Sequence, residues 1–399
     1  MSRPSQKSMY SYAWDFAEAG VSETVSQFKK LGINTVTLAA SYHAGKFFRP
    51  KAKTGKIYFP QDGTTYFKTN PNRYGAIKPV SNSIDGNGDV LTALTKDSSI
   101  KVNAWLVLLH NSRLGSENLG STVKNAFGDP YIYALCPSAP EARAYAIGLA
   151  SDVSESYEID GISMESIGFP PFEHGFHHEM SFVKPNVWLS SYLGLCFCEF
   201  CISGAEHAGV DAKSLKARVA KNINDYLAGD IDYPDDMAKA FWLADVAGDS
   251  EMRKFMDYRS SVVTSLVTEI RTVVRKDVEV AVIPSVARPT GGAWYEGTDL
   301  RAIADVTGVI EACFYENSAQ RITADLIDIK RRTDGVGTIK GILRPAYPDL
   351  ESREAVVSAI CALSDGGVHD IGFYNYGHIR SQSLAWIADA LASVDGRSK

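Results

Sequence analysis

The sequence has few cysteines, no long apolar run and no excess of positive charge. Its six cysteines are too few and too unevenly spaced in 399 residues for a disulfide-stabilised scaffold. No apolar stretch approaches the length of a membrane-spanning helix, and residues 1–7 contain no apolar signal core. The net charge is −6 and no basic stripe is present, which argues against nucleic acids and membranes as partners. We therefore expect a cytoplasmic protein.

Two common catalytic motifs are also missing. No glycine-rich phosphate-binding turn follows the first predicted strand, and no H-E-x-x-H or similar metal-binding spacing occurs. The composition, with 45% hydrophobic and 22% charged residues, is typical of a globular protein. We expect a single domain over residues 1–399, with long insertions at about 42–89 and 166–276. The sequence leaves both a monomer and a homo-oligomer open.

Eight strand candidates alternate with helical patterns or long loops. Most are continuous runs of Val, Ile, Leu and Ala, which is typical of parallel strands buried on both faces. The predicted strands are 9–14, 34–40, 102–109, 161–165, 278–284, 309–315, 337–343 and 370–374. This alternation predicts an α/β protein with a (β/α)8 TIM barrel, and an open doubly wound sheet is the second choice.

Residues 135–169 carry the most specific signal. Pro140 precedes an amphipathic helical pattern that extends to about Tyr157, and Asp160-Gly161 then turns the chain. The short apolar run after this turn ends at Glu165. Because catalytic side chains lie at the C-terminal ends of barrel strands, we predict that Glu165 is a catalytic acid. The alternative is a structural glutamate paired with a neighbouring strand.

The same segment resembles a group of (β/α)8 glycoside hydrolases and their hydrolase-like relatives. The pattern consists of Pro140-Glu141-Ala142-Arg143-Ala144-Tyr145, then Tyr157, Asp160-Gly161-Ile162 and Glu165. The resemblance extends over roughly residues 100–280. It implies a barrel that hydrolyses glycosidic bonds with two carboxyl groups, one of which donates a proton to the leaving oxygen. Many of these relatives have aspartate where this chain has Glu165.

Several acids are candidates for the second carboxyl group. Glu316 follows the sixth predicted strand and is our first choice, as nucleophile or base beside the general acid Glu165. Glu311 lies deeper in the same strand, and Asp349 lies beyond the seventh. In the best-known hydrolase clan the nucleophile is on strand seven, but residues 340–344 contain no acid. Other barrel hydrolases place the pair after strands four and six.

Polar and aromatic side chains follow most of the predicted strands and suit a carbohydrate pocket. Sugar rings stack on aromatic side chains, and their hydroxyl groups need polar partners. The predicted substrate-binding residues are Asp15, Tyr42, His43, His110, Asn111, His178, Glu311, Arg344, Asn375 and Tyr376. Arg288 and Arg344 also suit a carboxylate or phosphate on a charged sugar. A structural role is equally consistent with Asp15 and with some of the histidines.

Three cysteines, Cys196, Cys198 and Cys201, form a C-x-C-x-x-C motif. Thiolates at this spacing suit a tetrahedral zinc ion if a fourth ligand comes from elsewhere. The motif resembles the cysteine-ligated zinc site of certain β-galactosidases, and this resemblance implies Cys136 as the fourth ligand. Such a closed site would be structural. Buried free thiols are the alternative.

The sequence therefore predicts a glycosidase that acts on a small glycoside or oligosaccharide. Its chemistry requires no cofactor, and a structural zinc ion is the only metal implied. The histidines leave open a metal-dependent sugar isomerase, epimerase or lyase on the same barrel. A non-catalytic carbohydrate-binding barrel is a third alternative.

Overall fold

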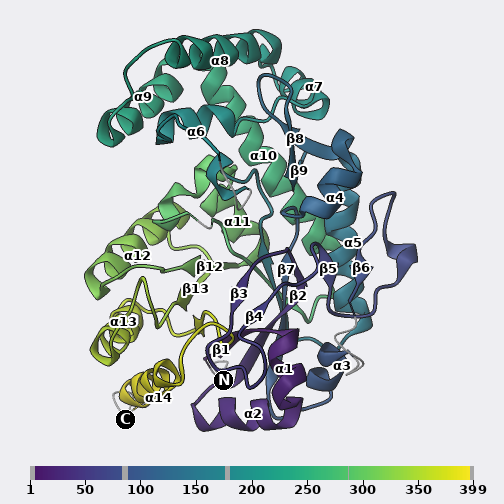
Figure 1. The fold of residues 1–399 in the computed structure, drawn as a ribbon, viewed down its shortest axis with the longest axis vertical. Coiled ribbons are helices and arrows are strands. Elements are labelled where there is room, and N and C mark those ends of the chain that lie inside the picture. Colours follow the sequence, from purple (N-terminus) through teal and green to yellow (C-terminus); the bar gives the residue numbers. More distant parts are fainter. Residues whose placement is uncertain (1–4, 83–88, 176–179, 286, 396–399) are drawn as a thin grey trace.

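The chain folds into a closed barrel of eight parallel strands surrounded by helices (Figure 1). This computed structural model describes residues 5–82, 89–175, 180–285 and 287–395. The barrel strands, in order around the ring, are β1 (Lys7–Tyr12), β2 (Thr35–Tyr42), β7 (Lys101–Val107), β10 (Gly161–Glu165), β11 (Glu279–Val282), β12 (Val309–Cys313), β13 (Thr338–Leu343) and β14 (Ile371–Phe373). Strand β1 pairs with both β2 and β14 and so closes the ring. The predicted (β/α)8 fold and its eight strands are confirmed.

Helices cover the outside of the barrel in the predicted alternation. They are α1 (Ala13–Ala19), α2 (Val21–Lys30), α3 (Val90–Thr95), α5 (Pro140–Ser156), α10 (Ser250–Val273), α11 (Leu300–Thr307), α12 (Ala319–Thr333), α13 (Arg353–Asp365) and α14 (Ser381–Asp395). Pro140 begins α5, a position where its missing N–H has no intrahelical partner to lose. Among the described residues, no helix combines the length and the apolar composition needed to cross a bilayer.

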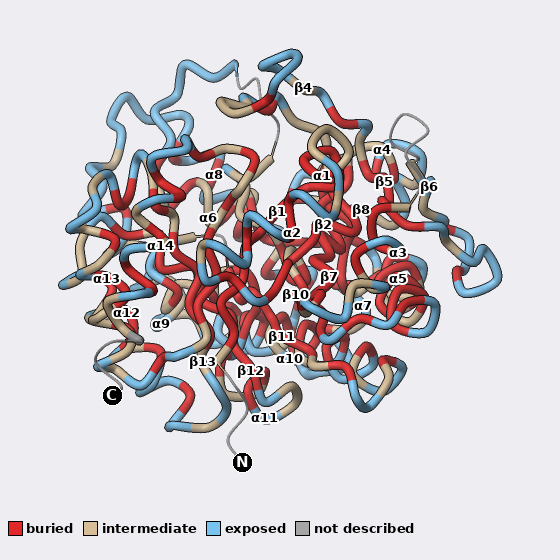
Figure 2. Tube along the Cα trace, turned by 90° about the horizontal axis from the view of Figure 1, so that it is seen from below, coloured by how far each residue is buried: buried red, intermediate tan, exposed pale blue. Residues whose placement is uncertain are grey.

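Burial explains why the barrel strands were recognisable as apolar runs. Every residue of β1, β2 and β12 is buried, because one face of each strand points into the barrel and the other packs against helices. Figure 2 shows these strands as buried chain at the centre, with exposed segments around them. The first strand ends at Tyr12, two residues before the predicted end, because residue 13 already begins α1.

Two insertions lie between early strands. The chain from β2 to β7 contains the hairpin of β3 (Phe47–Phe48) with β4 (Ile57–Tyr58), then β5 (Thr64–Thr65), the 3₁₀ turn η1 (Pro71–Arg73) and β6 (Val80–Ser81). The chain from β7 to α5 contains α4 (Ser112–Glu117), η2 (Leu119–Ser121), and the hairpin of β8 (Thr122–Lys124) with β9 (Pro130–Leu135). Strand β5 pairs with the end of β2, so the first insertion is attached to the barrel rim.

A helical lobe is inserted between β10 and β11. It contains η3 (Phe172–His174), α6 (Val187–Leu193), α7 (Glu199–His207), α8 (Ala212–Leu227) and α9 (Asp235–Gly248). The lobe has its own apolar cluster, with Trp188, Tyr192, Leu215, Trp242 and Phe255 among its buried residues. In Figure 1 these helices form the top of the molecule, and α10 connects them to the barrel. After β11, the chain forms a further 3₁₀ segment, η4 (Thr290–Glu296).

Candidate active site

Glu165 is the last residue of β10 and lies at the C-terminal end of the barrel. Its Oε2 atom accepts a hydrogen bond of 2.6 Å from Nε1 of Trp105 on the neighbouring strand β7. Burial raises the pKa of Glu165 from its ordinary value of 4.5 to about 7, and the hydrogen bond from Trp105 opposes this rise. A large share of the molecules therefore carries a neutral carboxylic acid here at neutral pH.

The alternation of side chains along β10 directs Glu165 into the barrel. Ser163, two residues earlier on the same face, donates a hydrogen bond of 2.6 Å to Oε2 of Glu311 on β12. Glu311 is only 3% exposed. Cys313 follows two residues later, and burial, together with the charges of Glu165 and Glu311, raises the pKa of its thiol. Glu165 and Cys313 thus lie one layer above Ser163 and Glu311, nearer the open end.

Three tyrosine hydroxyl groups meet beside Glu165. The hydroxyl oxygen of Tyr12 lies 3.2 Å from those of Tyr42 and Tyr374, which are 3.5 Å from each other. The ring of Trp105 packs against Tyr42 and Tyr374, with centroid distances of 4.9 and 5.9 Å. Burial raises the pKa of both tyrosines, and the charge of Glu165 adds to this rise. Neutral hydroxyl groups of this kind can donate to and accept from sugar hydroxyls.

Glu316, the predicted partner of Glu165, contacts a helix. Its carboxylate forms an ion pair with Arg321 of α12. Tyr315, the residue before it, contacts the ring of Tyr374 at 5.7 Å and so faces the barrel interior. Neighbouring side chains of an extended chain point to opposite sides, which agrees with the outward contact of Glu316. Within the described part of the chain, the contacts of Glu165 do not include Glu316.

Asp349 lies between two arginines at the same end of the barrel. Its Oδ1 atom is 2.6 Å from Nη1 of Arg288, and its Oδ2 atom is 2.6 Å from Nε of Arg344. The guanidinium group of Arg344 lies over the ring of Tyr315, 4.5 Å from its centroid. Because Tyr315 contacts Tyr374, Arg344 belongs to the surroundings of the tyrosine cluster.

Two of the predicted histidines lie in a row with a third. The ring of His43 stacks on Tyr42 at 4.3 Å and lies 4.7 Å from the ring of His110. His110 in turn lies 5.2 Å from His174, which belongs to η3. The row is joined to the tyrosine cluster through Tyr42. His178 lies outside the described residues.

Asp15 and Asn111 stabilise the starts of helices. Asp15 lies in the first turn of α1, and its carboxylate accepts a hydrogen bond of 3.0 Å from the backbone N–H of Tyr12. Burial raises the pKa of Asp15 to about 6. Asn111 precedes α4, and its Oδ1 atom accepts a hydrogen bond of 2.9 Å from the backbone N–H of Leu114. Both bonds satisfy N–H groups that a helix leaves unpaired at its start.

Asn375 and Tyr376 follow β14 and lie in different surroundings. The peptide bond between Tyr374 and Asn375 is cis. Asn375 is fully buried, and its Oδ1 atom accepts a hydrogen bond from the backbone N–H of Gly377. Tyr376 donates from its hydroxyl to Gln27 of α2, on the outer side of the barrel. The structure therefore does not bring Tyr376 to the tyrosine cluster.

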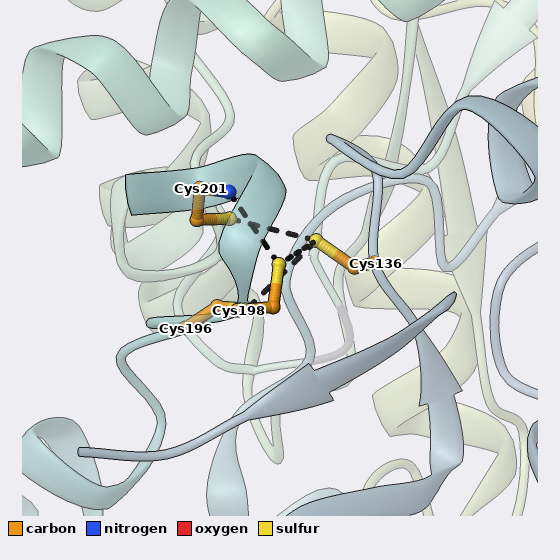
Figure 3. A group of neighbouring side chains, drawn as sticks. All are labelled: Cys136, Cys196, Cys198 and Cys201. Carbon is orange, nitrogen blue, oxygen red and sulfur yellow. Dashed lines mark hydrogen bonds between the residues drawn. The ribbon is translucent and has the colours of Figure 1, made fainter. Parts of the chain in front are cut away.

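The four predicted cysteines converge (Figure 3). The Sγ atom of Cys136 lies 3.8 Å from that of Cys196, 3.6 Å from that of Cys198 and 3.5 Å from that of Cys201. All four are buried, and their Sγ atoms lie within 4.8 Å of one another. Among the described residues, no other group of three or more His, Cys, Asp or Glu side chains is close enough to share a metal ion.

A buried arginine lies beside these cysteines. Arg259 of α10 is 2% exposed and donates to the backbone oxygens of Gly194 and Tyr295 at 3.3 and 2.8 Å. Its guanidinium group lies 4.3 Å from the ring centroid of Phe169. Burial lowers the pKa of Arg259, whereas negative charge on three of the four cysteines and on Glu296 opposes this change. Within the described chain Arg259 forms no ion pair with a carboxylate, and the negative groups that act on it are three of the cysteines and Glu296.

Sequence reasoning missed two contributors to the site. The predicted site residues do not include Trp105, although this side chain donates a hydrogen bond to Glu165. They also omit Tyr12, since the first strand is predicted over residues 9–14 and Tyr12 then lies within it and not at its end. The alternation of Tyr10 and Tyr12 in a short buried strand is the signal that could have identified both as interior residues.

The raised pKa of Glu165 predicts that glutamine at this position stabilises the protein above neutral pH. The folded wild-type protein must lose a proton at about pH 7, whereas the unfolded chain loses it near pH 4.5. The contribution of the protonated Glu165 carboxyl group to the unfolding free energy is therefore fully present below about pH 4.5, and it is lost as the pH rises to about 7. We expect Glu165→Gln to exceed the wild type by roughly 3 kcal/mol in unfolding free energy at pH 8 and to match it at pH 4. Urea unfolding at both pH values measures this; equal stability at pH 8 would contradict the raised pKa.

Comparison with known proteins supports the fold. No protein-family model and no curated protein matches the sequence. The endo-1,4-beta-mannanase from Rhizomucor miehei is structurally similar, with a TM-score of 0.52, 10% identity, and 99% of this chain and 97% of that chain covered. A chitinase from Chromobacterium violaceum has a TM-score of 0.45 and 9% identity, with 97% of this chain and 99% of that chain covered. At these identities, the likeness to the mannanase establishes a shared barrel fold.

Proposed function

We propose that this protein hydrolyses a glycosidic bond and that Glu165 is the general acid. The observation that carries this proposal is a carboxyl group with a pKa of about 7 at the C-terminal end of a barrel strand, beside three tyrosine hydroxyl groups. A neutral carboxylic acid can donate a proton to the leaving oxygen as the glycosidic bond breaks. The substrate would be a small glycoside or oligosaccharide.

Trp105 has a defined part in this mechanism. Its N–H donates to Oε2 of Glu165, which leaves Oε1 to carry the proton toward the leaving oxygen. The same hydrogen bond stabilises the carboxylate that remains after the proton has been transferred. In a retaining mechanism the Glu165 carboxylate takes a proton from the attacking water in the second step; in an inverting mechanism the second carboxyl group takes that proton and Glu165 is reprotonated from solvent. The chemistry requires no cofactor.

For the second carboxyl group, we keep Glu316 as the proposed nucleophile or base. Its ion pair with Arg321 would have to open, or the loop after β12 would have to turn, for its carboxylate to reach the sugar. Tyr42, His43 and His110 would bind sugar hydroxyl groups, since their rings adjoin one another beside Glu165.

The experiment that tests this proposal is a pH–rate profile on an alkyl glycoside, whose leaving oxygen must be protonated. Hydrolysis should fall as the pH rises through about 7, because the acid must be protonated. Trp105→Phe removes the donor that favours the carboxylate, so the alkaline limb should move upward by roughly 0.5–1 pH unit.

Trp188→Phe is a matched control for this shift. It removes a similar hydrogen bond of 2.7 Å, from the Trp188 indole to Asp245 in the helical lobe. The alkaline limb of the pH–rate profile of Trp188→Phe should coincide with that of the wild type. A limb that stays unmoved in Trp105→Phe, or moves to lower pH, would exclude Glu165 as the group that titrates.

We further propose that the four cysteines hold a structural zinc ion. Four buried sulfur atoms within 4.8 Å of one another suit a closed tetrahedral site. Four thiolates around Zn²⁺ carry a net charge of −2. The buried guanidinium group of Arg259, which forms no ion pair with a carboxylate, would offset part of this charge. We propose a cytoplasmic location, since a reducing compartment keeps such thiols available as ligands.

A further inference from the structure

Two arginines share one carboxylate near the candidate active site. Arg288 and Arg344 each approach a different oxygen of Asp349 at 2.6 Å. The Asp349 side chain is 2% exposed, whereas those of Arg344 and Arg288 are 25% and 39% exposed. The group therefore has one net positive charge, and this charge is on the accessible side chains.

The guanidinium group of Arg344 is held so that part of it stays available. Its Nε atom donates to Asp349, and its plane is supported by the ring of Tyr315 at 4.5 Å. Among the residues that the structure describes, no group accepts a hydrogen bond from Nη1 or Nη2 of Arg344. An arginine has five N–H donors, so four remain for a ligand. Because Asp349 and Tyr315 already hold the Arg344 side chain in place, binding of a ligand does not have to supply the entropy cost of ordering it.

Aromatic contacts at the C-terminal end of the barrel connect Arg344 to Glu165. Arg344 lies over Tyr315, Tyr315 contacts Tyr374, and Tyr374 packs against Trp105, which donates to Glu165. The positive charge of Arg344 acts on Cys313 and Tyr374, lowering the pKa of both against the larger effect of burial. The charge of Glu165 acts on the same two side chains. Arg344 and Glu165 therefore both lie near Cys313 and Tyr374, and we place the sugar beside these two side chains.

We propose that the substrate is an acidic glycoside whose sugar carries a carboxylate, as in a hexuronic acid, and that Arg344 binds this carboxylate. This inference rests on the proposed function. A guanidinium group matches a planar carboxylate with two parallel hydrogen bonds. The single net charge of the arginine pair and Asp349 also balances one carboxylate, whereas a sugar phosphate carries about −1.5 to −2 at pH 7.

The test compares pairs of 4-nitrophenyl glycosides that differ only at C6, where one member has a carboxylate and the other a hydroxymethyl group. We expect kcat/KM for one hexuronide to exceed that of its neutral partner by ~100-fold. Arg344→Gln should remove this preference, measured as the ratio of the two kcat/KM values, and Arg344→Lys should restore part of it. Arg353→Gln, which removes a half-exposed arginine paired with Asp389, is the matched control and should keep the preference.

The outcomes separate this inference from the proposed function. If kcat/KM for a neutral glycoside or for its 6-phosphate equals kcat/KM for the hexuronide, the inference of a carboxylate on the substrate is wrong. The proposed hydrolysis of a glycosidic bond is then still supported. If no glycoside is hydrolysed, the proposed function fails, and calorimetric binding of free hexuronic acids and hexoses decides the inference. Tighter binding of one hexuronic acid, lost in Arg344→Gln, would uphold it; equal binding of both sugars would overturn it.

Discussion

Glu165→Gln should lower kcat for an alkyl glycoside by roughly 10²–10⁴-fold without unfolding the protein, because a general acid contributes about this factor. Glutamine has nearly the same shape and keeps an acceptor for the Trp105 N–H. It has no proton to donate at any accessible pH. Steady-state kinetics with an alkyl glycoside as substrate, beside thermal unfolding of the same samples, measures the effect.

Glu158→Gln is the matched control for this loss. The Glu158 side chain is 85% exposed and pairs with Arg275 before the start of β10, at the opposite end of the strand. The control should have wild-type kinetics. A Glu165→Gln enzyme within about threefold of the wild type would remove Glu165 from the mechanism. In the same assay, a loss of similar size in Glu316→Gln is expected if Glu316 is the second carboxyl group.

Cys198→Ser should remove the bound zinc and lower the unfolding free energy by more than about 3 kcal/mol. Cys198 contributes its sulfur to the cluster and also accepts a hydrogen bond from the backbone N–H of Cys201 at the start of α7. Loss of the metal would leave the remaining buried thiols without the zinc ion. It would also leave the buried positive charge of Arg259 without the negative zinc–thiolate cluster. Elemental analysis of the purified protein should give about one zinc ion per wild-type chain and none in the variant.

Cys361→Ser provides the control for the loss of a thiol. Cys361 lies in α13, is partly buried, and is not part of the cluster. It should keep the zinc content and nearly all the stability of the wild type. A metal-free wild-type protein whose unfolding is unaffected by added zinc or by a chelator would show that the cluster is a set of buried free thiols.

The barrel could be predicted because its strands are buried on both faces. Runs such as residues 309–313 and 338–343 are recognisable without knowledge of their neighbours, and helical patterns separate them. The convergence of the four cysteines was also predicted, through a resemblance that supplied the distant Cys136. The short strands of the insertions were not predicted, since two-residue elements such as β5 form only by pairing with the barrel rim.

The candidate site was less predictable, because it depends on which side each residue faces after its strand ends. The sequence places Glu316 at the end of a strand, but the side chain contacts Arg321, while Tyr315 faces inward. The meeting of Tyr12, Tyr42 and Tyr374 joins residues from three strands and requires the closed ring of β1 with β2 and β14. No local pattern encodes such a contact.

The most direct test of the central claim, that Glu165 is the proton donor, is the dependence of the Glu165→Gln defect on the leaving group. Two glycosides of the same sugar are compared, one with an alkyl leaving group and one with dinitrophenolate, which leaves without protonation. We predict a loss in kcat/KM, which reports on the step that breaks the glycosidic bond, of roughly 10²–10⁴-fold on the alkyl glycoside and less than about 10-fold on the dinitrophenyl glycoside. An equal loss on both substrates would contradict it.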